Sequence, residues 1–278
     1  MNNNLWKATS QYEKAMLYAY RVHDGQKRKG TEIPYISHLL AVSGIVLENG
    51  GTEAEAIGAL LHDAIEDQKT HKDRLRVKHE IREYFGLEVL NIVEGCSDTL
   101  AESVLPPGDG KIDWKIRKTE YIDKVRNESA SVRLVSSADK LHNARAILAD
   151  YREIGDALWD RFNRKDKKEH LWYYRKLTEA FIKTNTAPRI VEELNRVVSA
   201  INGLIKKNGK LYKFGDRMLT EDEILAECHK IGEAGRAWIA AGNKDLTDEE
   251  LEATGAINTT PKDDGDTISI VNIGLGLK

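Results

Sequence analysis

Apolar residues recur at three- and four-residue intervals along most of the first 206 residues, which predicts a series of amphipathic helices. Almost no segment before residue 210 alternates with the two-residue period of a strand. We therefore predict an all-α helical bundle over residues 1–206. Its helices are expected over residues 8–24, 37–49, 53–67, 73–84, 87–97, 113–128, 130–148, 167–182 and 187–206.

Glycine and polar capping residues mark the helix ends. Gly50 and Gly51 end the helix over 37–49, and Thr52 with Glu55 predicts a capping box for the next helix. Gly25 to Ile33 reads as a basic loop. The sequence Leu-Pro-Pro-Gly-Asp-Gly at 105–110 is a second loop signal.

The pattern changes after Lys206-Lys207, so residues 207–278 are predicted to form a separate C-terminal extension of mixed helix and strand. Residues 211–214 (LYKF) suggest a short strand, and Thr220 with Glu223 suggests a helix start. Thr247 with Glu250 repeats that signal, and the end of the chain, TISIVNIGLGLK, is strand-like. The role of this extension is left open between a lid, a homo-oligomer contact and a docking element.

Composition narrows the setting of the protein. Of 278 residues, 41% are hydrophobic and 31% charged, and no stretch approaches the roughly 20 apolar residues that span a bilayer. Cys96 and Cys228 are far apart without CxxC spacing, as in free thiols of a reducing compartment. The net charge of −3 offers no general attraction for nucleic acid. We expect a cytoplasmic protein with no membrane or nucleic-acid partner, whose polyanionic substrates are held by local basic groups.

Histidine and carboxylate residues suggest a metal site. His62-Asp63 is followed one helical turn later by Glu66-Asp67, with His38 upstream and Asp139 downstream. A divalent metal that activates water takes neutral imidazole and carboxylate ligands and keeps coordination positions open. Mixed nitrogen and oxygen ligands suit manganese, iron or zinc better than calcium, and spacing does not choose among them.

The second acidic pair, Glu66-Asp67, could activate a water molecule if the helix over 53–67 continues through it. Glu66 follows His62 by four residues and Asp67 follows Asp63 by four, so both would share the face of the ligands. There they could accept a proton from an attacking water. Taken alone, however, an acidic pair at a helix end is usually solvated surface.

Three segments carry a family resemblance. Residues 35–38 (YISH), 60–67 (LLHDAIED) and 138–143 (ADKLHN) resemble the HD-domain hydrolases of the RelA/SpoT type, in particular their hydrolase domain and the stand-alone small alarmone hydrolases. The resemblance runs from about residue 8 to residue 182. The Glu-Asp pair after the His-Asp pair is its specific part.

The resemblance implies an HD-domain fold with one metal, usually manganese, and hydrolysis of the 3′-pyrophosphate of guanosine tetra- or pentaphosphate. It assigns metal binding to His38, His62, Asp63 and Asp139, water activation to Glu66 and Asp67, and substrate binding to Arg28, Lys29 and Asn143.

Two departures from the family bear on substrate identity. The loop between Lys29 and Pro34 is one residue longer than usual, and Ala146 stands where the family often has a hydroxyl residue. Two alternatives therefore stay open. One is a phosphohydrolase for another nucleotide, such as an adenosine alarmone or NADPH; the other is a regulator that binds the alarmone without cleaving it.

For the other aromatic and histidine residues the sequence predicts structural roles or leaves two roles open. Trp172-Tyr173-Tyr174 either stacks on a base or belongs to the core. His142 is expected to support a ligand or the fold, and His23 and His170 are expected to be surface or packing residues.

Overall fold

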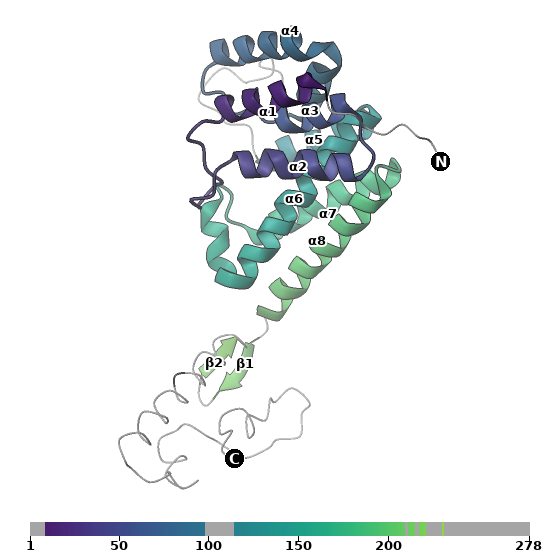
Figure 1. Ribbon diagram of the computed structural model, residues 1–278. Coiled ribbons are helices and arrows are strands. Elements are labelled where there is room, and N and C mark those ends of the chain that lie inside the picture. Colours follow the sequence, from purple (N-terminus) through teal and green to yellow (C-terminus); the bar gives the residue numbers. More distant parts are fainter. Residues whose placement is uncertain (1–8, 98–113, 209–210, 215–216, 221–229, 231–278) are drawn as a thin grey trace, which may run out of the picture. The chain divides into compact units, whose positions relative to one another are not determined.

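The computed structural model describes residues 9–97, 114–208, 211–214, 217–220 and residue 230 (Figure 1). The helices are α1 (Ser10–Val22), α2 (Ile36–Glu48), α3 (Glu53–Leu61), α4 (His71–Cys96), α5 (Trp114–Asn127), α6 (Ala130–Ile154), the 3₁₀ helix η2 (Gly155–Arg161), α7 (Lys167–Lys183) and α8 (Pro188–Asn208). The chain divides into two compact units, residues 1–201 and 202–278. The predicted all-α class is confirmed, whereas the predicted domain boundary after residue 206 stays a prediction.

The predicted signals between α2 and α3 are confirmed. Gly50 adopts a φ of +80°, and its N–H donates to the Leu47 carbonyl at 3.0 Å. The Gly51 N–H donates to the Val46 carbonyl at 3.0 Å, which completes a Schellman motif. At the start of α3, the Thr52 hydroxyl accepts from the Glu55 N–H and the Glu55 carboxylate accepts from the Thr52 N–H. These two motifs fix the turn between α2 and α3.

The predicted helix over 53–67 is wrong in its second part. α3 ends at Leu61, and residues 62–67 form successive turns. The His62 Nδ1 atom lies 2.8 Å from the Ala59 carbonyl oxygen, to which the backbone N–H of Asp63 would donate if the helix continued. This side chain competes with the backbone for its acceptor, so the chain leaves the helix at the His-Asp pair.

The helices expected over 73–84 and 87–97 are found as the two arms of α4. They meet at Gly86, whose φ of +88° and ψ of 172° lie outside the helical region. A residue with a side chain would be strained at this φ. α6 runs past the predicted residue 148 and ends at Ile154, before Gly155 with φ +57°. The 3₁₀ helix η2 was not predicted.

A hydrophobic cluster joins the first four helices. Gly58 brings α3 and α4 close together, because a Cβ atom there would lie 2.6 Å from Cγ2 of Ile92. The close approach fixes the end of α3 from which His62 projects. The buried members of the cluster are Ala15, Ala19, Leu39, Ile57, Leu60, Leu61, Ala64, Val77, Ile81, Val89, Leu90 and Val93.

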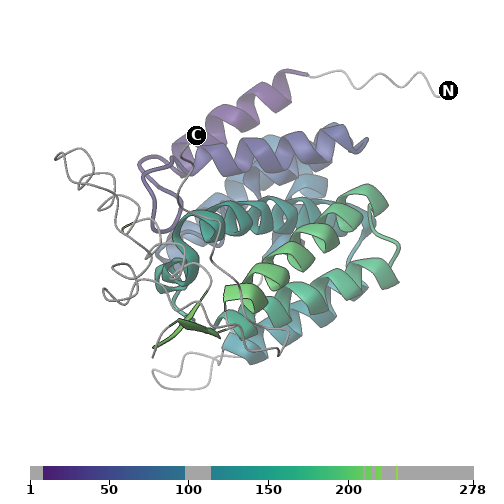
Figure 2. The same cartoon turned by 90° about the horizontal axis from the view of Figure 1, so that it is seen from below.

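α6 is the helix on which α2, α3 and α4 all pack, and it crosses the middle of the first unit (Figure 2). On its other side, Ile147 of α6, Trp159 of η2, Tyr174 of α7 and Ile201 of α8 line one small cavity. α2 also packs on α3. Three helices that carry or end at a predicted metal ligand are thus in mutual contact.

The described part of the second unit contains the end of α8 and a β-hairpin. β1 (Leu211–Phe214) pairs antiparallel with β2 (Arg217–Thr220), with Leu211 opposite Thr220 and Phe214 opposite Arg217. The strand predicted over 211–214 is confirmed, and β2 was not predicted. The predicted loop at 105–110, the helix after Thr220, the cap at Thr247 and the strand-like C-terminal end lie outside the described residues. Among the described helices, none combines the length and apolar character needed to cross a membrane.

Candidate metal centre

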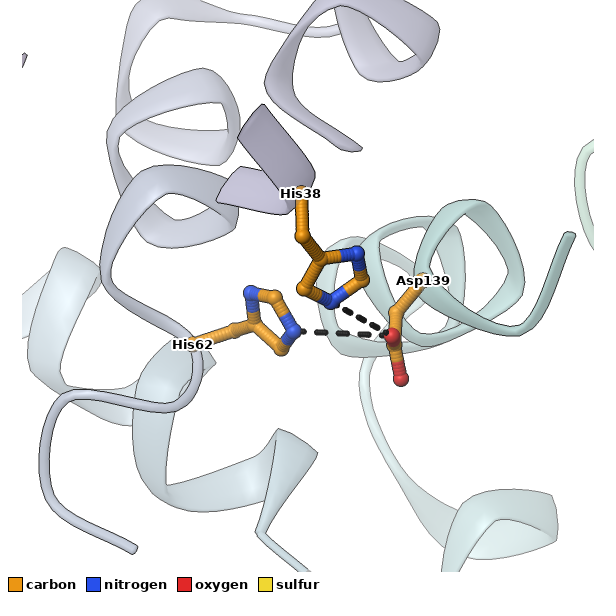
Figure 3. Close-up of side chains that lie close together, drawn as sticks. All are labelled: His38, His62 and Asp139. Carbon is orange, nitrogen blue, oxygen red and sulfur yellow. Dashed lines mark ion pairs between the residues drawn. The ribbon is translucent and has the colours of Figure 1, made fainter. Parts of the chain in front are cut away.

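Two imidazoles and one carboxylate from three elements converge on one point (Figure 3). His38 lies in the first turns of α2, His62 follows the last residue of α3, and Asp139 lies in α6. The Asp139 Oδ1 atom is 3.2 Å from His38 Nε2 and 3.6 Å from His62 Nε2. These three ligand atoms lie within 4.8 Å of one another, and all three residues are buried.

Hydrogen bonds on the far side of each ring orient the imidazoles. His62 Nδ1 lies 2.8 Å from the Ala59 carbonyl oxygen, which can only accept, so this nitrogen carries the proton. His38 Nδ1 lies 2.7 Å from Nδ1 of His142. Both Nε2 atoms are buried and find no hydrogen-bond partner within the described part of the chain. A cation bound between them would satisfy both, so the residues present fit a divalent metal.

The Asp139 carboxylate is held on both of its oxygens. Lys140 Nζ donates to Oδ2 at 2.6 Å, and Asn143 Nδ2 donates to Oδ1 at 2.5 Å. Arg28 Nη2 in turn donates to Oδ1 of Asn143 at 2.7 Å. Asn143, predicted to contact substrate, thus links Asp139 to Arg28. The adjacent Lys140, to which the sequence assigned no role, orients the Asp139 carboxylate.

Asp63 lies beside the three-residue group. Its Oδ2 atom is 3.0 Å from His62 Nε2 and 3.7 Å from His38 Nε2. The Tyr35 hydroxyl donates to the same oxygen at 2.6 Å. Tyr35 belongs to the YISH segment, but the sequence predicted no function for it. Nothing in the spacing of the His-Asp pair indicates that this tyrosine contacts Asp63.

Charge sets the protonation of the four groups. Burial lowers the pKa of His38, and Asp139 acts in the opposite direction without reversing the shift. Burial also disfavours the charged form of His62, but Asp63 and Asp139 outweigh it and hold the pKa of His62 well above its ordinary value. Burial would raise the pKa values of both carboxylates. The charge of His62 at Asp63, and of Lys140 at Asp139, outweighs burial and lowers them. Both carboxylates are therefore ionised at neutral pH, as metal ligands must be.

Glu66 and Asp67 lie on the turns after α3, and other side chains hold them. Ser97 Oγ donates to Glu66 Oε2 at 3.0 Å, and Gln26 Nε2 donates to Asp67 Oδ2 at 2.7 Å. Burial and the nearby Asp63 charge raise the pKa of Asp67. A carboxyl group with a raised pKa is a better proton acceptor, which suits the predicted role of Asp67.

The two basic residues predicted to bind substrate diverge. Arg28 reaches Asn143 and lies over the Tyr35 ring, with 5.8 Å between its Cζ atom and the ring centroid. Lys29 instead donates to Asn163 Oδ1 at 3.1 Å. Only Arg28 joins the network that leads to Asp139.

The aromatic run at 172–174 and the basic residue Lys124 have structural positions. Tyr173 and Tyr174 are buried, which favours the core reading of that run. Lys124 donates to the carbonyls of Glu94 and Ser97 at 3.0 Å each, at the C-terminus of α4. This lysine thus donates to carbonyls at the end of α4, where a helix has no intrahelical donors left.

The fold and the site together define a class of protein. It is a helical bundle whose central helices bring two imidazoles and a carboxylate together, at a site for a divalent metal ion. The chain belongs to the HD domain family, because the family model described as "HD domain" matches residues 15–161, more than half of its length. That range contains His38, His62, Asp63 and Asp139.

Two curated relatives illustrate the similarity. The chain is 34% identical over 138 residues to a GTP pyrophosphokinase of Myxococcus xanthus, a match that covers 49% of this chain and 17% of that protein. It is 36% identical over 133 residues to the guanosine-3′,5′-bis(diphosphate) 3′-pyrophosphohydrolase MESH1 of Xenopus tropicalis, with coverage of 47% and 65%. The chain thus spans less than a fifth of the first relative and just under two thirds of the second.

A solved structure supports the fold. The protein is similar to a metazoan ortholog of SpoT that hydrolyses ppGpp, with a TM-score of 0.52 and 22% sequence identity. The similarity covers 71% of this chain and 98% of that chain.

Proposed function

We propose that this protein is a metal-dependent hydrolase that removes the 3′-pyrophosphate from guanosine tetra- or pentaphosphate. The observation that carries the proposal is the convergence of His38, His62 and Asp139, with both Nε2 atoms turned to one point. The names of the two relatives differ. The pyrophosphohydrolase match covers 65% of that enzyme, whereas the pyrophosphokinase match covers 17% of its length. The larger coverage favours hydrolysis.

The metal in this proposal is a single manganese ion held by His38, His62, Asp139 and Asp63. The mixed nitrogen and oxygen set supports a transition metal over calcium. When bound, a divalent ion would supply Lewis-acid activation of water and neutralise charge on the phosphate. Asp63 would serve as the fourth ligand while Tyr35 keeps its hydrogen bond to the carboxylate.

Glu66 and Asp67 are proposed to orient the attacking water and to take its proton. The water oxygen forms a bond to the phosphorus next to the ribose, and the bond from that phosphorus to the 3′ oxygen breaks. The proton removed from water is returned to the ribose oxygen, and pyrophosphate leaves. Positioned carboxylates with partial burial suit this acid–base work, and Asp67 has the raised pKa that it favours.

Arg28 and Asn143 are proposed to bind the substrate, with Lys29 as a weaker contributor. Arg28 can bind phosphate through two nitrogens, so its bond to Asn143 would be exchanged or shared when the nucleotide arrives. We place this activity in residues 1–206 of a cytoplasmic protein without nucleic-acid or membrane partners. Self-association is one role proposed for residues 207–278.

A product assay tests the function. The protein is incubated with manganese and, separately, with ppGpp, its adenosine counterpart and NADPH, and the products are separated by chromatography. We expect GDP and pyrophosphate from ppGpp, and no products when a chelator is present. If phosphate were released from NADPH and nothing from ppGpp, NADPH would be the substrate in place of ppGpp. Tight binding of ppGpp without products would indicate a regulator.

A further inference from the structure

A buried histidine lies behind the acidic turn, at a position that the sequence assigned only to the surface or to packing. His23 follows α1, and its side chain is 0% exposed. Its Nδ1 atom lies 2.8 Å from Oε1 of Gln26, whose Nε2 donates to Oδ2 of Asp67 at 2.7 Å. A continuous hydrogen-bonded path therefore joins His23 to Asp67.

The chemistry of this path fixes the direction of each bond. The Asp67 carboxylate only accepts when ionised, so it faces the amide nitrogen of Gln26. The amide oxygen of Gln26 then faces His23, and only a protonated Nδ1 can donate to it. The other ring nitrogen, Nε2, is buried without a partner among the described residues, where an N–H would be costly. The path thus selects the neutral Nδ1–H tautomer of His23.

The same ring supports a second carboxylate through Tyr35. The His23 and Tyr35 rings are stacked, with centroids 5.2 Å apart and an angle of 26° between their planes. The Tyr35 hydroxyl donates to Asp63. The backbone ties these groups together, because the Tyr35 N–H donates to the Gln26 carbonyl at 2.9 Å and the Gln26 N–H donates to the His23 carbonyl at 3.0 Å.

We propose that His23 and Gln26 are positioning residues of the hydrolytic site, with His23 fixing the Gln26 amide and Gln26 fixing the Asp67 carboxylate. This inference rests on the proposed function, in which Asp67 handles the attacking water. Asp67 needs such support because its side chain is 31% exposed and lies on a turn rather than on a helix. Gln26 is the one described side chain seen to donate a hydrogen bond to this carboxylate.

Paired substitutions separate the hydrogen bond from the ring. His23→Phe keeps an aromatic ring beside Tyr35 and removes the donor, whereas His23→Asn keeps a donor near the place of Nδ1 and removes the ring. Gln26→Leu removes the middle of the path at a half-buried position. We expect His23→Phe and Gln26→Leu to lower kcat by about 10- to 100-fold, with KM and bound metal little changed. His23→Asn should recover part of kcat.

His170 provides a matched control. It is also buried, its Nε2 atom donates one hydrogen bond at 2.7 Å to the Arg164 carbonyl, and its ring stacks on Trp159 with centroids 5.3 Å apart. His170→Phe therefore removes a similar bond and keeps a similar stack away from the acidic turn. Its kcat should equal that of the wild type. Equal losses of kcat in His170→Phe and His23→Phe would mean a merely structural role and would overturn the proposal.

A second readout does not depend on turnover. Long-range ¹⁵N–¹H spectra of the imidazole should show His23 as the Nδ1–H tautomer, and Gln26→Leu should shift that signal. An Nε2–H tautomer, or normal kcat in both His23→Phe and Gln26→Leu, would overturn the positioning role while the proposed function stands. A wild-type protein that releases no pyrophosphate from ppGpp would instead overturn the function, and the positioning role with it.

Discussion

The side chains of His38, His62 and Asp139 are at most 8% exposed and are held at packed helices, whereas Asp67 lies on a turn with its side chain 31% exposed. Helix contacts and buried hydrogen bonds fix the first group. The carboxylates of the acidic turn are held by side-chain hydrogen bonds, such as that from Ser97 to Glu66 and that from Gln26 to Asp67. Under the proposed function, we expect the buried group to determine metal binding and stability and the turn to determine the rate. Substitutions in the two regions should therefore fail in different ways.

The largest expected effect comes from the buried group. Asp139→Asn removes a ligand charge and leaves the Lys140 ammonium, 2.6 Å away, without its carboxylate. We expect loss of bound metal and of pyrophosphate release, and a fall of about 3 kcal/mol in the free energy of unfolding. Metal analysis, a turnover assay and urea denaturation measure the three quantities.

Asp150→Asn is the control for this prediction, since Asp150 is also in α6 and accepts from Arg161 at 2.6 Å. It should keep the metal. If Asp139→Asn also kept a full complement of metal, the buried group would not be the binding site.

The next effect comes from the turn. Glu66→Gln keeps the size of the side chain but removes the base, so we expect metal content to stay normal while kcat falls by about 100-fold or more. Steady-state kinetics on metal-loaded protein measures it. Glu88→Gln, on the exposed surface of α4, is the matched control. Wild-type turnover by metal-loaded Glu66→Gln would remove Glu66 from the reaction.

Tyr35→Phe tests Asp63, which lies between the buried group and the acidic turn. The substitution keeps the ring against His23 and removes the hydroxyl that donates to Asp63. We expect about a 10-fold weaker affinity for manganese, with kcat largely restored at saturating metal. A metal titration followed by activity separates the two quantities. An unchanged affinity would mean that Asp63 does not need this hydrogen bond.

The sequence predicted the buried group better than the turn for physical reasons. Helical periodicity placed His38 and Asp139 on α2 and α6, and those helices pack as an apolar face requires. The same periodicity wrongly predicted that α3 continues through Asp67. Helix propensity does not reveal that the His62 ring forms a hydrogen bond with the Ala59 carbonyl and so ends the helix.

Hydrophobic periodicity also does not predict hydrogen bonds between side chains that are far apart in the sequence. Gln26 meets Asp67 and Tyr35 meets Asp63 only because the loop before α2 folds against the turn after α3. Lys140 was missed although it adjoins Asp139, since a lysine in a charged helix usually points to solvent. The sequence therefore predicted His38, His62 and Asp139, which the structure brings together, but not the side chains that orient them.

The smallest expected effect is a pH dependence of the metal-free protein. Burial, followed by the nearby charges of His38 and Arg28, lowers the pKa of His142 to about 4 from an ordinary value of 6.5. The unfolded chain thus binds a proton at this position before the folded chain does, and stability falls as pH drops from about 6.5 towards 4.

His142→Asn should reduce that fall. Urea denaturation at pH 7 and pH 5, in the presence of a chelator, compares the two proteins. The loss of unfolding free energy between these pH values should be smaller in the variant. An equal loss in both proteins would show that His142 does not titrate in this way.

The most direct test of the central claim is a manganese titration of metal-free protein, with bound metal and pyrophosphate release from ppGpp measured in the same samples. We predict that release rises in proportion to bound metal, saturates at one ion per chain and disappears with a chelator. Pyrophosphate release that is indifferent to the chelator, or one bound ion without any release, would contradict the account.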